Sequence, residues 1–246
     1  MLTSAKDKLI LTEEQKLMYS NEKVTNFRLI SRQFAELAYN VIPVATAFQN
    51  LPVLVEPGLP LEGYRALLPA RLLNSFVGTT AHLPGFVAYR EDTGQLIVAI
   101  SGTNVDSALQ ALYNIHALRH PHPSKRGKIH SGFWKLYKGI RTPCLAGLRD
   151  ALTELNGRIS EVVITGHSMG SAISQLLVLD ILHDESLLPL GNAPLHFVGF
   201  GGPRVGTEGL VNFWSELVGK RQKQHGNKSF AEFAVKMHND GQTIYD

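Results

Sequence analysis

The spacing of apolar and polar positions changes near residue 80. Before that point, apolar residues recur at helical spacing over 26–39, where Asn26 is a candidate N-cap, and proline-rich loops follow. After it, the runs 85–90 and 96–100 flank a short glycine-containing turn and predict a β-hairpin. We therefore expect an N-terminal helical and loop wrap over 1–80, in the same domain as a core over 81–246.

Three unbroken apolar runs predict buried strands. They cover 96–100, 162–164 and 196–200, and helical patterns over 147–155 and 168–183 lie between them. A continuous apolar run, unlike an alternating one, indicates a strand covered on both faces. Strands that alternate with helices are typical of an α/β fold with a mostly parallel sheet.

Composition narrows the class of protein. The 246 residues are 44% hydrophobic and 18% charged, with a formal net charge of +3. This size suits one α/β domain, and so small a charge does not favour a nucleic-acid partner. Cys144 is the single cysteine, the first residues contain no apolar signal-peptide core, and no apolar run is long enough to span a membrane. We expect an intracellular protein, in the cytoplasm or at lipid surfaces.

A G-x-S-x-G pattern at residues 166–170 lies between the apolar run 162–164 and a helical pattern. A nucleophile elbow needs a buried strand, a sharp turn with a strained serine, and glycines two residues on either side. Ser168 is therefore the candidate nucleophile, which attacks an acyl carbonyl with support from the helix N-terminus. The alternative is a turn of small residues that packs a helix against a sheet.

Four segments together resemble the class three lipases, the fungal lipase-like family of the α/β-hydrolase fold. They are 100–103 (Ile-Ser-Gly-Thr), 129–133 (Ile-His-Ser-Gly-Phe), 166–170 (Gly-His-Ser-Met-Gly) and 201–206 (Gly-Gly-Pro-Arg-Val-Gly). The resemblance implies an α/β-hydrolase-type, mostly parallel sheet flanked by helices. It also implies cleavage of acylglycerol esters through an acyl-serine intermediate, without a metal or organic cofactor.

An oxyanion hole needs two hydrogen-bond donors. One is expected from the backbone N–H of Met169, which follows the nucleophile, and the resemblance implies Thr103 as the other. The resemblance also places a lid over 106–113, although a plain surface helix fits that segment too.

The next segment, 116–128, is a basic loop broken by prolines. Its histidines, His116, His120 and His122, suggest a metal site only weakly, because the prolines prevent helical presentation of the ligands. A solvated loop and a loop attracted to anionic lipid are the other interpretations.

The acid and the base of a triad come last in this fold. A strand is predicted over 230–237, and the resemblance places the acid shortly after it, at Asp240, which a turn aspartate would also explain. No histidine follows Asp240, so the general base is unassigned; the histidines that precede Asp240 are His183, His196, His225 and His238. The family's last strand and helix are expected to be absent, which leaves a sheet edge for a partner to cover.

The leading hypothesis is a lipase or carboxylic ester hydrolase that acts at a lipid–water interface. One alternative is a catalytically silent, lipid-binding or regulatory truncated homologue. Another is a soluble esterase of short or aromatic acyl esters. Hydrolysis of an acyl-ester series distinguishes the three.

Overall fold

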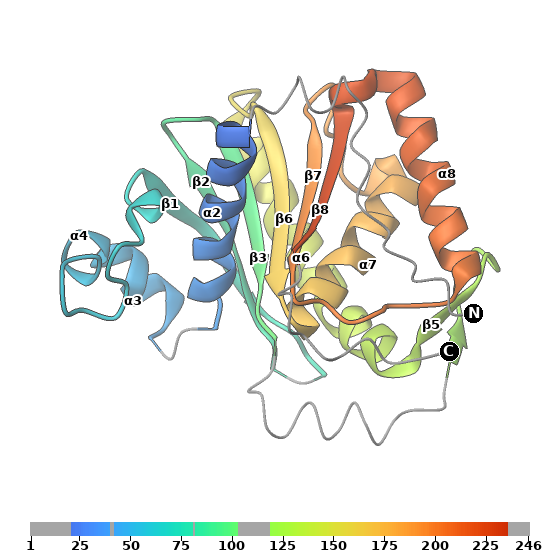
Figure 1. Ribbon diagram of the computed structural model, residues 1–246, viewed down its shortest axis with the longest axis horizontal. Coiled ribbons are helices and arrows are strands. Elements are labelled where there is room, and N and C mark those ends of the chain that lie inside the picture. Colours follow the sequence, from blue (N-terminus) through green and yellow to red (C-terminus); the bar gives the residue numbers. More distant parts are fainter. Residues whose placement is uncertain (1–20, 40–41, 81, 103–118, 236–246) are drawn as a thin grey trace, which may run out of the picture.

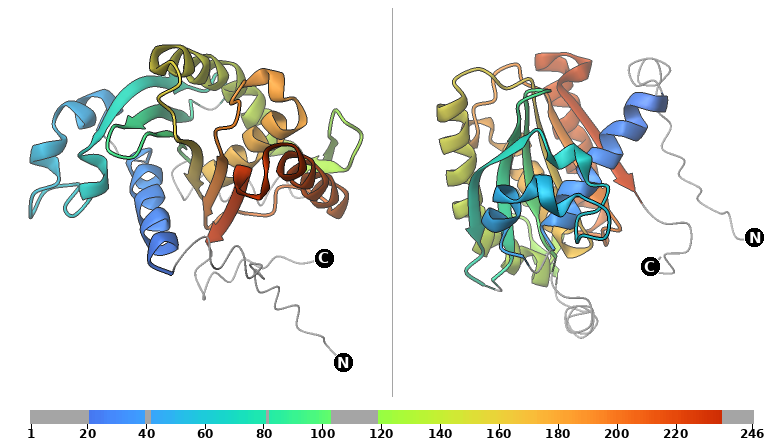
Figure 2. Two further views of the ribbon diagram at one scale, coloured as in Figure 1. Left: turned by 90° about the horizontal axis from the view of Figure 1, so that it is seen from above. Right: turned by 90° about the vertical axis from the view of Figure 1, so that its left-hand side faces the viewer.

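The computed structural model describes residues 21–39, 42–80, 82–102 and 119–235. A sheet separates a layer of helices at the front from another at the back (Figures 1 and 2). The helices are α2 (Asn21–Leu37), α3 (Val44–Gln49), α4 (Leu51–Leu54), α6 (Ser131–Leu155), α7 (Met169–His183) and α8 (Glu208–His225). The strands are β1 (Ala70–Val77), β2 (Pro84–Arg90), β3 (Gln95–Ile100), β4 (Arg119–Pro121), β5 (Lys128–His130), β6 (Glu161–His167), β7 (Leu195–Phe200) and β8 (Phe230–Val235).

The main sheet has six strands in the order β1-β2-β3-β6-β7-β8. Strands β1, β2 and β3 form an antiparallel meander, whereas β3, β6, β7 and β8 are parallel. Every residue of β3 and of β7 is buried, because helices cover both faces of the sheet. The predicted α/β fold, with apolar strands covered on both sides, is confirmed.

Two apolar clusters fill the two sides of the sheet. In one, Phe34 and Leu37 of α2 pack against Phe86 and Ile97 of the sheet. In the other, α7 packs against the sheet between α6 and α8, with twelve of its fifteen residues buried. Among the described residues, no helix combines the length and apolar character that a membrane crossing needs.

Several elements differ from the sequence-based expectation. Helix α2 begins at Asn21, so Asn26 lies inside it and is not its N-cap. Strand β1 lies within the predicted helical wrap, and its register shifts between Leu72 and Asn74, which hides the two-residue period of a strand. Helix α6 continues through Pro143, since the apolar residues on both sides of the proline are buried and offset its cost of roughly 3 kcal/mol.

Helix α8 was not expected at all. The signal for it is present, because its apolar positions recur at three- and four-residue spacing: Leu210, Phe213, Trp214 and Leu217, all buried. Thirteen other positions of the helix are not buried, and this polar majority makes the periodicity easy to miss. The helix therefore covers the core with one narrow apolar stripe.

The predicted basic loop contains a two-stranded hairpin, β4–β5, which His122 anchors to the core. The His122 side chain is buried, and its ring contacts those of Trp134, His183 and Phe213, which lie on α6, α7 and α8. Its Nδ1 atom accepts a hydrogen bond from the backbone N–H of Ser124 at 3.2 Å and lies 2.6 Å from the Ser124 hydroxyl oxygen. These contacts require a neutral ring.

The hairpin anchor should make stability sensitive to acid. Burial, with a smaller contribution from His183, lowers the pKa of His122 below its ordinary value of 6.5, and Asp180 opposes the shift. The contribution of neutral His122 to the free energy of unfolding is complete above pH 6.5. It declines as the pH falls below 6.5, because the unfolded chain then binds a proton that the folded chain does not. We expect H122F to reduce the difference in Tm between about pH 7.5 and about pH 5.5.

The matched control is H120F, because His120 lies on the same hairpin and is exposed. This variant should keep the wild-type difference in Tm between the two pH values. Equal acid sensitivity of H122F and the wild type would contradict the assignment of the effect to His122.

Candidate active site

Ser168 occupies the sharp turn between β6 and α7. Its φ and ψ are 51° and −122°, a backbone region that residues other than glycine rarely adopt. Such strain costs about 1–3 kcal/mol and persists only where the surroundings enforce it. Here the backbone N–H of Ser168 donates to the carbonyl oxygen of Phe200 at 2.8 Å, which holds the turn against the end of β7.

The two glycines of the motif are required by close packing. A Cβ atom at Gly166 would lie 2.5 Å from the carbonyl carbon of Gly170. A Cβ atom at Gly170 would lie 2.2 Å from the carbonyl oxygen of Ile100, at the end of β3. The strand, the strained serine and the close glycine contacts that the motif predicted are all present.

The turn lies at the edge of the sheet where the parallel strands end. Met169 is the first residue of α7, so its backbone N–H has no acceptor within the helix and lies at the positive end of the helix dipole. Gly170 packs against Ser101 and Gly102, which places the segment after β3 beside Ser168. The Met169 N–H is thus placed to favour a negative charge beside Ser168.

Three predicted parts of the site lie outside the described residues. They are Thr103, the expected second oxyanion donor, the expected lid over 106–113, and Asp240, the expected acid. Thr103 directly follows Gly102, whose contacts with the turn are described above. The roles of these residues stay predictions.

The structure adds Tyr39, which the sequence analysis did not identify. Its hydroxyl donates to the carbonyl oxygen of His167 at 2.5 Å, and the Ser168 side chain and the Gly102 backbone also lie within hydrogen-bonding reach of the phenol. Burial raises the pKa of Tyr39 to about 12, so the phenol remains a donor at neutral pH. No local motif marks Tyr39, because its contact with His167 joins residues 128 positions apart.

Tyr39 should position the reacting serine. Since Y39F removes one hydrogen bond beside Ser168, we expect hydrolysis of a soluble ester to fall about tenfold, with little change in Tm. The control is Y89F, because the hydroxyl of Tyr89 also donates to a backbone carbonyl, that of Arg158, which precedes β6 at the opposite edge of the sheet. Equal rates for the two variants would contradict a role of Tyr39 at the site.

Of the four upstream histidines that the sequence left open as bases, the three that the structure describes lie away from Ser168. His196 pairs with Val163 in the middle of the sheet and binds Glu161 at 2.9 Å. His183 ends α7, about 20 Å along the helix from its first turn. His225 lies 3.3 Å from Glu185, and His238 is outside the described residues. The general base therefore stays unassigned.

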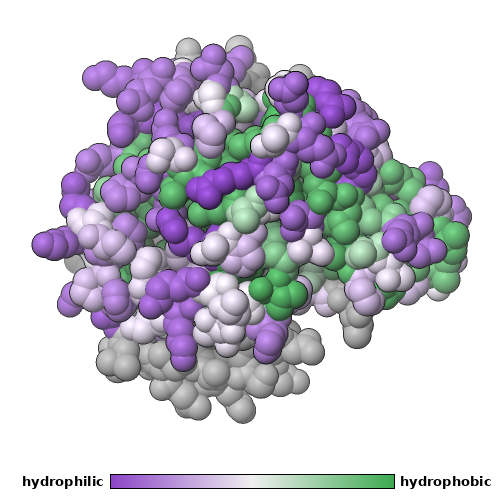
Figure 3. Space-filling view, turned by 180° about the vertical axis from the view of Figure 1, so that it is seen from behind, coloured by the Kyte–Doolittle hydropathy of each residue, from purple (hydrophilic) through white to green (hydrophobic). Residues whose placement is uncertain are grey.

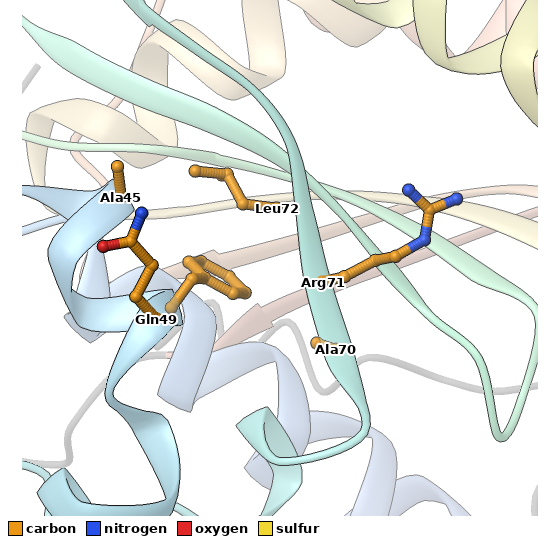
Figure 4. A pocket seen from close by; sticks show the side chains of 6 residues that line it. Ala45, Gln49, Ala70, Arg71 and Leu72 are labelled. Carbon is orange, nitrogen blue, oxygen red and sulfur yellow. The ribbon is translucent and has the colours of Figure 1, made fainter.

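A separate pocket lies between α3 and β1 (Figure 4). Phe48 and Leu72 line it together with Ala45, Gln49, Ala70 and Arg71. In Figure 4 the Arg71 side chain points away from α3, and its guanidinium binds Glu91 and Glu154. The remaining side chains include no nucleophile or titratable group, and β1 is three strands from β6. The pocket is thus separate from the serine site.

The mixed sheet, its two helical layers and the strained serine between β6 and α7 define an α/β-hydrolase-type protein. The comparison with known families is more specific. The model of the family described as Lipase (class 3) matches residues 97–240, which is more than half of the chain. The protein belongs to this family.

Individual relatives agree with the family. The chain is 28% identical over 220 residues to the chloroplastic phospholipase A(1) DAD1 of Arabidopsis thaliana, covering 71% of this chain and 47% of the relative. It is 26% identical over 175 residues to the secreted mono- and diacylglycerol lipase 3 of Gibberella zeae, covering 60% and 53%. The chain thus spans about half the length of these curated relatives. Because their names include a secreted and a chloroplastic protein, the intracellular location stays a prediction.

Solved lipase structures share the fold. The crystal structure of the lipase from Rhizopus microsporus var. chinensis aligns with a TM-score of 0.60 at 20% identity, covering 89% of this chain and 67% of that one. A lipase–propeptide complex from Rhizomucor miehei aligns with a TM-score of 0.61 at 17% identity, covering 80% and 58%. At these identities the structures support the fold and no finer conclusion.

Proposed function

We propose that this protein hydrolyses carboxylic ester bonds of acylglycerol-type lipids through an acyl-serine intermediate. The observation that carries the proposal is the strained backbone of Ser168, held at the start of α7 against the ends of β3 and β7. A strained serine at such a turn has a known catalytic use, whereas a packing turn needs no strain. The lipid names of the relatives support an acyl lipid as the substrate.

In the proposed reaction, the Ser168 hydroxyl oxygen attacks the carbonyl carbon of the ester. The negative charge that forms on the carbonyl oxygen is stabilised by the backbone N–H of Met169 and by Thr103, and removal of one such donor typically costs about 10²–10³ in rate. The alcohol leaves, and water then hydrolyses the acyl-serine. Asp240 orients the base that accepts and returns the proton.

The direct test is covalent labelling. A p-nitrophenyl alkylphosphonate should release p-nitrophenol and leave its phosphonyl group on the peptide that contains Ser168, as measured by mass spectrometry of a digest. The variant S168A should release no p-nitrophenol. Labelling at another residue, or none at all, would refute the proposed nucleophile.

Substrate class needs a second measurement. An ester series of increasing acyl length, assayed below and above the solubility limit, distinguishes a lipase from a soluble esterase. A lipase gains rate when the substrate forms an aggregate, whereas a soluble esterase of short or aromatic esters does not. We expect a gain for the longer esters.

The base can be tested without knowing its identity. His167 is next to Ser168 in the sequence, and its ring lies against that of Tyr39, with centroids 5.4 Å apart. The test does not depend on whether this or another histidine is the base. If the chain carries its own base, added imidazole will leave the rate of acylation unchanged. A clear acceleration by imidazole would favour the silent, lipid-binding homologue instead, since a serine without a base is a poor nucleophile.

A further inference from the structure

The charges of this chain are unevenly distributed along the sequence. Residues 119–149 contain eight Lys and Arg residues and no Asp or Glu. The other 215 residues contain 16 Lys and Arg against 21 Asp and Glu. A segment of net charge +8 thus belongs to a chain whose remainder is net negative, although the total of +3 is small. The described part of the chain therefore contains a strongly basic segment.

This segment forms the β4–β5 hairpin and most of α6, and its first half lies at the Ser168 edge of the sheet. The backbone N–H of His130 donates to the carbonyl oxygen of Val205 at 2.9 Å, and that of Thr207 donates to the carbonyl oxygen of Lys128 at 3.0 Å. These bonds fix β5 to the loop that leaves the end of β7. Figure 1 shows the hairpin at the lower right, in the lower half of the view where β3 and β6 also end.

Five of the eight cations have exposed side chains and form no ion pair with another described residue. We call these five the basic rim: Arg119, Lys125, Lys128, Lys135 and Lys138. The other three are bound, since Arg126 pairs with Glu216 and Arg141 with Asp180, both at 2.5 Å, and Arg149 donates to the carbonyl oxygen of Leu187. The rim therefore presents its charge to solvent.

Apolar side chains lie among these cations. Trp134 is partly buried on the first turn of α6, where its ring stacks on that of His120 with centroids 5.9 Å apart. Val211 is 53% exposed on the first turn of α8, beside Leu210, which packs against Gly127 of the hairpin. In Figure 3, which shows the molecule from behind, hydrophilic side chains gather at the lower left.

We propose that the basic rim docks this protein on a lipid surface that carries anionic headgroups. Spread, exposed cations with interspersed aromatic and aliphatic groups suit an extended interface, because lysine and arginine pair with headgroups while the apolar groups enter the boundary below them. Docking through the rim turns the edge that bears Ser168 toward the lipid. This last consequence rests on the proposed function, whereas the docking itself does not.

The test uses the full chain with S168A, so that the vesicles are not hydrolysed. Cosedimentation compares vesicles of phosphatidylcholine with vesicles that also contain phosphatidylglycerol. Each basic residue near an anionic surface contributes about fivefold to binding, so the triple variant K125Q/K128Q/K138Q should bind the anionic vesicles about 100-fold more weakly. The control K220Q/K223Q/K228Q removes the same charge from exposed positions at the opposite edge and should bind like the parent.

Three results would overturn the proposal: equal binding to both kinds of vesicle, equal weakening by both triple variants, or tighter binding to a short DNA duplex than to anionic vesicles. A preference for anionic vesicles that only proteins with an intact rim show, and that disappears at high salt, would support the proposal. With Ser168 restored, K125Q/K128Q/K138Q should hydrolyse a soluble short-chain ester at the wild-type rate. Failure of the wild type to hydrolyse any ester would refute the proposed function and leave the vesicle result intact.

Discussion

Replacement of Ser168 by alanine is expected to lower the rate of ester hydrolysis by about 10³-fold or more, to the level that binding and the oxyanion donors alone supply. The substitution removes the attacking oxygen and leaves the rest of the turn in place. Because alanine and serine tolerate a φ of 51° equally poorly, Tm should hardly change. The loss is measured as kcat/KM on a soluble ester, beside thermal unfolding of the same sample.

A second substitution separates catalysis from strain at the same position. The variant S168G also lacks the hydroxyl, but glycine adopts a positive φ without penalty. Release of roughly 1 kcal/mol of strain should raise Tm by about 2–4 °C above that of S168A. A gain in stability together with a loss of activity is typical of a serine held in place for function. If S168G unfolds at or below the Tm of S168A, Ser168 is not strained in the way that its dihedral angles indicate.

The strands that the sequence marked most clearly are those whose burial is uniform. The inner parts of β3, β6 and β7 are covered on both faces, so the runs 96–100, 162–164 and 197–200 within them contain no polar side chain. Strand β1 has no such pattern, because it lies at the edge of the sheet and shifts register at Leu72. Helix α8 is mostly polar for the related reason that it packs through a narrow stripe on the outside of α7. Where one face meets solvent, the period is weak and easily missed.

The serine site was predictable for a different reason. A Cβ atom at either glycine would lie only 2.2–2.6 Å from the nearest backbone atoms, so the packing leaves a readable signature over five consecutive residues. Tyr39 has no such signature. Its hydroxyl reaches the carbonyl oxygen of His167 and the neighbourhood of the Ser168 side chain only through the tertiary fold, and any helix that ends beside the sheet can present a tyrosine. Local rules therefore found the nucleophile but not the phenol that contacts it.

The substitution with the largest expected effect on folding and on activity together is G170A. A Cβ atom there would lie 2.2 Å from the carbonyl oxygen of Ile100, 2.8 Å from the carbonyl carbon of Ser101 and 3.0 Å from the nitrogen of Gly102. All three are backbone atoms of β3 and its continuation, so the clash cannot be relieved by rotation of a side chain. We expect a loss of about 2–3 kcal/mol and a fall in Tm of roughly 5–10 °C.

Activity of G170A should fall further than its stability suggests. The clash moves α7 away from the end of β3, and with it the Met169 N–H away from the segment that leads to Thr103. Oxyanion donors act only at hydrogen-bonding distance, so hydrolysis by the folded protein should drop at least about 100-fold. The control G219A makes the same change on the exposed side of α8, where a Cβ atom meets nothing within 4 Å and should stabilise the helix slightly. Wild-type activity in folded G170A would show that Ser168 does not depend on close packing against β3, and the proposed site would have to be revised.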